Sequence, residues 1–165
     1  FPKEKTAPEW MTLSLPLAAM RKSIWKRHPF YTLAWGSEDT EWGLWAKKHG
    51  YTVAYVPDAE VMHSHNYSLK EIYGRRFIEG EADAFIYKKK SNLFQSFKQL
   101  LGSLRSDLKY HLLHRDFNAI PLIPIRRSVY HWAYYKGHHF GSKRIQNGSN
   151  NAQFGQNVVL SRYGK

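Results

Sequence analysis

Residues 36–68 read GSEDTEWGLWAKKHGYTVAYVPDAEVMHSHNYS, and this stretch decides how the rest of the chain is interpreted. Ser37 is followed by acidic residues and predicts a helix start, because serine caps helices and carboxylates favour the positive end of the helix dipole. Gly50 is typical of a helix end. Residues 51–56 (YTVAYV) predict a strand that ends at Pro57. A lone strand leaves both of its edges unpaired, so we expect the rest of its sheet to lie before residue 1.

Helices are predicted on both sides of this stretch. An apolar stripe after Pro16 predicts a helix over residues 17–27, and Ser68 with Glu71 forms a capping box that begins a long helix. A further helix is predicted after Asn92, and a last one follows two prolines at 121 and 124. The apolar stripe of the helix after Asn92 consists of Leu93, Phe97, Leu100, Leu101, Leu104, Leu108 and Leu112. The predicted fold class is α/β, mostly helical with one or two strands.

Composition limits the possible classes of protein. Twenty-five Lys and Arg against thirteen Asp and Glu give the 165 residues a net charge of +12, which favours anionic partners. The absence of cysteine excludes a disulfide scaffold, a cysteine-based zinc finger, an iron–sulfur site and a cysteine nucleophile. The mean hydropathy of -0.60 and the lack of long apolar runs predict no transmembrane helix. We divide the chain into residues 1–90, which hold most of the carboxylates, a basic helical extension over 91–141, and a polar tail over 142–165, which we expect to be largely mobile.

Two groups of polar side chains are candidates for chemistry. Glu38 and Asp39 lie among Trp35, Trp42 and a third tryptophan at 45, which would shield a carboxylate from water and raise its basicity. The alternative is that these acids only complement the helix dipole. His63 and His65 are two positions apart in an extended segment, so both imidazoles can face one metal or phosphate. Here the alternative is an exposed polar strand end.

The order of these motifs resembles the C-terminal half of a family 2 glycosyltransferase. It is most similar to the rhamnosyltransferase-like bacterial members that build cell-surface polysaccharide. The resemblance is carried by AAMRKSIW (18–25), HPF (28–30), EDTEW (38–42) and the run over 50–68. It extends over roughly residues 15–90, and several unlike motifs in the same order are more specific than any one of them.

This resemblance implies a GT-A (Rossmann-like) fold, with residues 1–90 as the acceptor-side half of the catalytic domain. It also implies an inverting displacement from a nucleotide-sugar donor to a saccharide or lipid-linked acceptor. Asp39 would be the general base and Glu38 a supporting group, with Trp35 and Trp42 lining the acceptor pocket. His63 would reach a divalent cation (Mg or Mn) or the donor diphosphate, and His65 is a second metal candidate.

One departure from the family pattern is that no Asp-x-Asp motif, which holds the cation and the donor diphosphate, occurs in the 165 residues. We therefore expect the donor-binding half to precede residue 1, and the chain alone to be inactive and to bind no cation tightly. Two alternatives remain open: a basic module that binds nucleic acid or another polyanion, and a non-catalytic glycosyltransferase-like subunit. Nucleic acid is not the expected partner, because the recognised binding motifs are missing.

The basic extension predicts a second kind of surface. Lys98, Arg105 and Lys109 flank the leucine stripe, and Arg126 and Arg127 follow it. A basic amphipathic helix can lie in the headgroup plane of an anionic membrane. The alternative is that the leucines pack on the catalytic half. The expected location is cytoplasmic, either free or peripheral on the inner face of the membrane.

Overall fold

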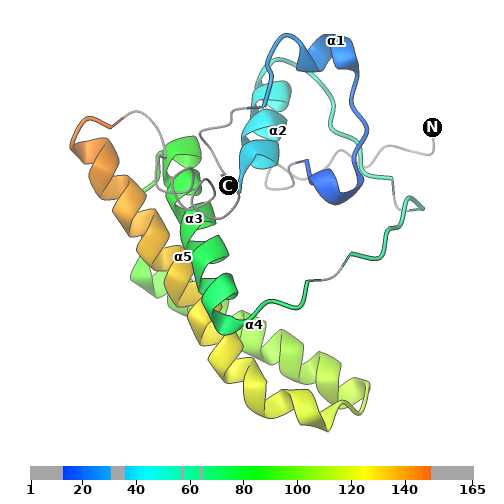
Figure 1. Ribbon diagram of the computed structural model, residues 1–165, viewed down its shortest axis with the longest axis vertical. Coiled ribbons are helices and arrows are strands. Elements are labelled where there is room, and N and C mark those ends of the chain that lie inside the picture. Colours follow the sequence, from blue (N-terminus) through cyan, green and yellow to red (C-terminus); the bar gives the residue numbers. More distant parts are fainter. Residues whose placement is uncertain (1–12, 31–35, 57, 64, 150–165) are drawn as a thin grey trace, which may run out of the picture.

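The computed structural model describes residues 13–30, 36–56, 58–63 and 65–149. Two short helical turns come first, η1 (Leu15–Leu17) and α1 (Lys22–Trp25), followed by α2 (Glu38–Lys48). Three long elements and a linking 3-10 helix complete the described chain (Figure 1): α3 (Leu69–Tyr87), α4 (Leu93–Leu113), η2 (Phe117–Leu122) and α5 (Ile123–Gln146). The prediction of a mostly helical chain is confirmed.

The predicted strand is wrong for the part of the chain that the structure describes. Residues 51–56 form no strand, and only Ala54 makes an isolated bridge. An extended segment becomes a strand only where a neighbouring strand pairs with it, and none of the described residues supplies one. The segment instead runs on as an extended connection between α2 and α3 (Figure 1). The helical content of the α/β prediction is therefore observed, and its sheet is absent from the residues that the structure describes.

The helix predicted over 17–27 is broken into two short turns. The chain is extended at Ala18 (φ -145°, ψ 146°) between η1 and α1, so the apolar stripe there does not extend through one helix. The capping box at the start of α3 is confirmed, since the Ser68 side chain accepts from the Glu71 amide and Glu71 reaches back to the Ser68 amide. Asn92 caps α4 by accepting a hydrogen bond from the Gln95 amide.

α3 and α5 pack side by side at very short range (Figure 1). Three glycines, Gly80 on α3 with Gly137 and Gly141 on α5, form a glycine seam between them. A Cβ at Gly137 would lie 1.9 Å from the Phe77 carbonyl oxygen, and one at Gly80 would lie 2.2 Å from the Tyr134 carbonyl oxygen. Any side chain larger than hydrogen would hold the two backbones apart. The adjoining core is correspondingly made of small residues, with Ala82, Ala84 and Ala133 fully buried.

Hydrogen bonds and an ion pair join α4 to α5. Ser103 Oγ lies 2.9 Å from His131 Nε2, and Arg127 forms a bidentate ion pair with Asp107. None of the residues of α4 is buried. The leucine stripe is packed only in part within the described residues: Leu100 and Leu104 are half-buried, and the rest of the stripe is exposed. α5 also continues to Gln146, so residues 142–146 of the expected polar tail are helical.

Candidate functional site

The acidic pair, Glu38 and Asp39, lies in the first turn of α2. Asp39 is half-buried, and its two carboxylate oxygens accept hydrogen bonds from the backbone amides of Leu15 (3.3 Å) and Thr40 (2.7 Å). Glu38 accepts a hydrogen bond from the Gly36 amide at 3.1 Å. Both carboxylates thus meet N–H groups at the positive end of the helix, as the dipole favours. The Asp39 carboxylate is held in one orientation by two separate segments of backbone.

An aromatic cluster fixes the side of α2 behind the acidic pair. Trp42 is buried, and its indole N–H donates to the His28 carbonyl oxygen at 2.8 Å. The His28 ring stacks on Trp45 with centroids 4.5 Å apart, and its Nε2 lies 3.0 Å from both Glu41 carboxylate oxygens. These contacts tie α2 to the segment after α1. Trp35, the other predicted acceptor-pocket residue, lies outside the described residues.

Ser37 does not cap α2, contrary to the sequence prediction. Its side chain makes no capping hydrogen bond, and its hydroxyl instead bonds to the carboxylate of Asp83 on α3. Ser37 is buried, and the adjacent Gly36 lies against Ile78 of the same helix. The head of α2 is therefore attached to α3 directly beside the acidic pair.

Asp83 is a half-buried carboxyl group that the sequence analysis missed. The Tyr134 hydroxyl on α5 donates to it at 2.7 Å. Burial raises the pKa of Asp83, because it disfavours the charged form, and the hydrogen bonds from Tyr134 and Ser37 oppose that rise. Burial and the neighbouring Asp83 charge also raise the pKa of the Tyr134 hydroxyl. Asp83 thus joins three elements, the head of α2, α3 and α5, in one hydrogen-bonded group.

Two further acids of α3 are matched by arginines. Glu81 is fully buried and accepts a hydrogen bond from Arg144 Nη1 of α5 at 2.9 Å. Glu79 pairs with Arg76, whose guanidinium lies over the Tyr130 ring at 3.9 Å from its centroid. Burial raises the pKa of Glu79, and Arg76 opposes that rise. A signal for this cluster was present in the GEADA run at 80–84, where acids alternate with residues small enough for close helix packing.

The two histidines lie in the extended connection before α3. The His63 and His65 rings are 4.3 Å apart and nearly perpendicular, and His65 stacks on Tyr67. Desolvation, with the neighbouring His63 and Arg75, lowers the pKa of His65. Across the described ranges, no three His, Cys, Asp or Glu side chains gather as a metal site. Mg and Mn prefer carboxylate oxygens, so this pair of imidazoles does not fit the cation that the resemblance implies.

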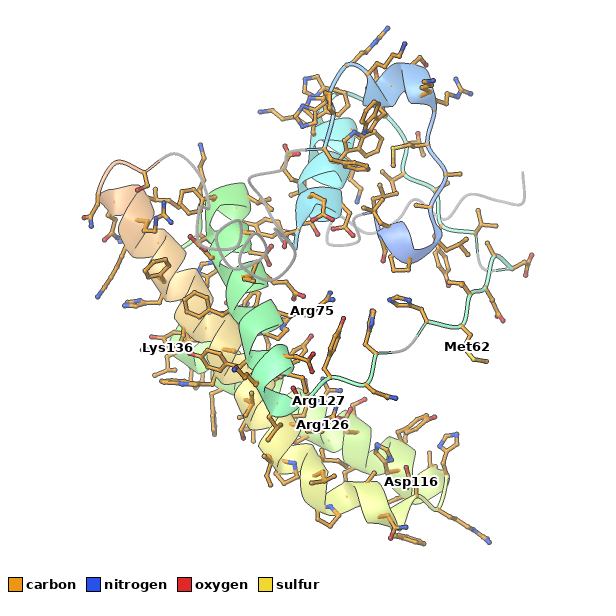
Figure 2. The ribbon with its side chains drawn as sticks, viewed as in Figure 1. Met62, Arg75, Asp116, Arg126, Arg127 and Lys136 are labelled. Carbon is orange, nitrogen blue, oxygen red and sulfur yellow. The ribbon has the colours of Figure 1, made fainter. Side chains whose placement is uncertain are left out.

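The predicted anion-facing cations occupy different environments. Arg127 forms its ion pair with Asp107 at 2.5 and 2.7 Å, so its charge is already matched within the chain. Arg126 donates to the Tyr67 carbonyl oxygen at 3.4 Å and lines, with Arg127, a cavity of about 420 Å³ between α3, α4 and α5. Figure 2 shows both arginines where α5 passes the start of α3. Lys98, Arg105 and Lys109 are exposed on α4.

Comparison of the chain with protein-family models, with curated proteins and with solved structures finds no match. Of the described helices, none has the length and apolar character needed to cross a bilayer.

Proposed function

We propose that this chain is the acceptor-side part of an inverting, nucleotide-sugar-dependent glycosyltransferase of the family 2 type. The observation that carries the proposal is the ordered run of unlike motifs over residues 18–68, with Asp39 at a loop-to-helix junction. The half-buried, doubly hydrogen-bonded carboxylate of Asp39 and the aromatic anchoring of α2 support it. The donor would be bound by a part of the enzyme outside these 165 residues.

In the proposed reaction, Asp39 takes the proton from an acceptor hydroxyl as that oxygen attacks the anomeric carbon of the donor sugar. The new C–O bond forms on the face opposite the leaving group. The bond to the nucleoside diphosphate breaks with its electron pair, so the anomeric configuration inverts. A sugar hydroxyl is a poor nucleophile, and removing its proton during attack is the step for which a positioned carboxylate is needed. Glu38, one residue earlier, would orient the acceptor.

The decisive experiment uses the protein encoded by the complete reading frame that contains this chain. Release of nucleoside diphosphate from a panel of nucleotide sugars is measured with saccharide and lipid-linked acceptors. Asp39→Asn is expected to lower kcat by about 10² to 10⁴-fold, because it keeps the shape of the side chain and removes its basicity. Asp58→Asn, an equal change at an exposed position, serves as the matched control.

The same variants distinguish a catalytic from a structural role for Asp39. If this carboxylate only holds the Leu15 and Thr40 amides, Asp39→Asn will lower the melting temperature and leave kcat close to that of Asp58→Asn. That result would remove Asp39 as the base. A complete protein that folds but turns over no donor in the panel would favour the non-catalytic subunit.

A further inference from the structure

α4 carries an exposed apolar face along its whole length. Phe94, Phe97 and Leu101 are 66%, 53% and 50% exposed, values that are unusual for side chains of this size. Within the described residues, α5 and η2 cover only the opposite side of this helix, where Leu100, Leu104 and Asp107 are half-buried. The α4 apolar face consists of Leu93, Phe94, Phe97, Leu101, Leu108 and Leu112.

A row of cations lies beside this face. At about 100° per residue, Lys98, Arg105 and Lys109 project along one edge of the α4 apolar face. All three are exposed, and the Lys98 ammonium also lies over the Phe94 ring at 4.7 Å from its centroid. The single acidic residue of α4, Asp107, is turned toward α5 and paired with Arg127. The exposed side of α4 is therefore apolar and cationic, with no carboxylate.

We propose that α4 docks on the surface of a bilayer that contains anionic phospholipids. The 21-residue helix is about 30 Å long and would lie in the plane of the headgroups, with the α4 apolar face toward the acyl chains. Lys98, Arg105 and Lys109 reach the lipid phosphates at the edge of that face. Charge complementarity selects this occupant, because a purely apolar partner would leave the cation row unmatched. The inference does not rest on the proposed transferase activity, since membrane docking needs no donor or acceptor.

The test is sedimentation of the 165-residue chain with vesicles of phosphatidylcholine alone and with about a third phosphatidylglycerol. Binding is expected only to the anionic vesicles and is expected to weaken as salt is raised. The variant Lys98→Glu/Arg105→Glu/Lys109→Glu is expected to bind about 100-fold or more weakly, from three cation contacts. Its matched control is Lys22→Glu/Lys26→Glu/Lys48→Glu, which changes the net charge equally at exposed positions outside α4.

A second pair of variants tests the apolar half of the proposal. Phe97→Gln/Leu101→Gln is expected to weaken vesicle binding at least tenfold, because these exposed side chains would enter the acyl region. Leu17→Gln/Val61→Gln, at positions 51% and 53% exposed but outside α4, should leave binding unchanged. Circular dichroism should show the same helix content for all four variants, since each replaces exposed side chains.

Several outcomes would overturn the proposal. The absence of binding to any vesicle would do so, as would equal losses in the α4 variant and its lysine control, which would indicate non-specific attraction. A dimer in sedimentation velocity that Phe97→Gln/Leu101→Gln dissociates would assign the face to a second copy of the chain. Duplex DNA binding that depends on the same three cations, with vesicle binding unaffected by the glutamine variants, would assign it to a polyanion.

Discussion

Gly137→Ala should separate α3 from α5, although in an isolated helix the same change is favourable. The added Cβ would lie 1.9 Å from the Phe77 carbonyl oxygen and 2.7 Å from its carbonyl carbon. These are backbone atoms, which cannot turn aside as a flexible side chain can. To reach an ordinary contact distance of 3.4 Å, the two helix backbones must move apart locally by about 1.5 Å. A gap of about 1 Å between packed atoms already loses up to half of the dispersion energy of their contacts.

The size of the effect follows from two opposing terms. Overpacking of this kind costs about 3 kcal/mol, and the better helix propensity of alanine returns about 1 kcal/mol. The net loss of about 2 kcal/mol should lower the melting temperature by about 4–8 °C for a chain of this size. Gly141→Ala should be milder, because its Cβ would meet the Glu81 oxygen and Ala84 Cβ at 2.8 Å.

Gly102→Ala on α4 is the matched control for this prediction. A Cβ there meets nothing within 4 Å, so only the propensity gain of up to about 1 kcal/mol applies. Thermal and urea unfolding followed by circular dichroism should therefore rank the proteins as Gly102→Ala, wild type, Gly141→Ala and Gly137→Ala, from most to least stable. A Gly137→Ala protein as stable as wild type would refute the close backbone contact between α3 and α5.

Two further predictions concern local stability and pH. Ser68→Ala should lower the free energy of unfolding by about 1 kcal/mol, because it removes the hydrogen bond that the Ser68 side chain accepts from the Glu71 amide. Urea unfolding measures this loss, and an unchanged midpoint would contradict the prediction. Burial lowers the pKa of His131 and of His138 below the usual 6.5, so the folded state binds fewer protons than the unfolded state. The free energy of unfolding should therefore be highest above pH 6.5 and should fall as the pH is lowered below that value. His138→Gln should make the free energy of unfolding less dependent on pH below 6.5, and an unchanged dependence would exclude His138 as a contributor.

Local signals in the sequence predicted ends of α2, α3 and α4, but they did not predict the break at Ala18 within residues 17–27. Gly50, Ser68 and Asn92 mark helix ends through contacts within a few residues, and α2, α3 and α4 end or begin beside them. Local signals could not decide whether residues 51–56 form a strand, because a strand forms only when a partner elsewhere in the chain pairs with it. The leucine stripe of α4 predicted an amphipathic helix correctly but could not indicate which surface would cover it.

The candidate site was only partly accessible to sequence reasoning. The acidic pair was found because its position at a helix start is a local pattern, and its assignment as a catalytic group stays a prediction. Asp83 was missed because its partners, Ser37 and Tyr134, lie about fifty residues away on either side. Arg127 was interpreted as an anion-facing cation because no local pattern indicates that Asp107 reaches it from another helix.

The hydrogen bonds of Asp83 and the glycine seam also determine where the chain can be cut. A fragment that ends near residue 90 would keep α3 but lose α5, leaving Gly80 and the fully buried Glu81 exposed to water without Arg144. It would also lose the Tyr134 hydroxyl, which donates a hydrogen bond to Asp83 beside the Ser37 contact. Limited proteolysis within α5 should therefore loosen the head of α2, more than eighty residues earlier in the chain, so the N-terminal and C-terminal halves should unfold together rather than as separate units.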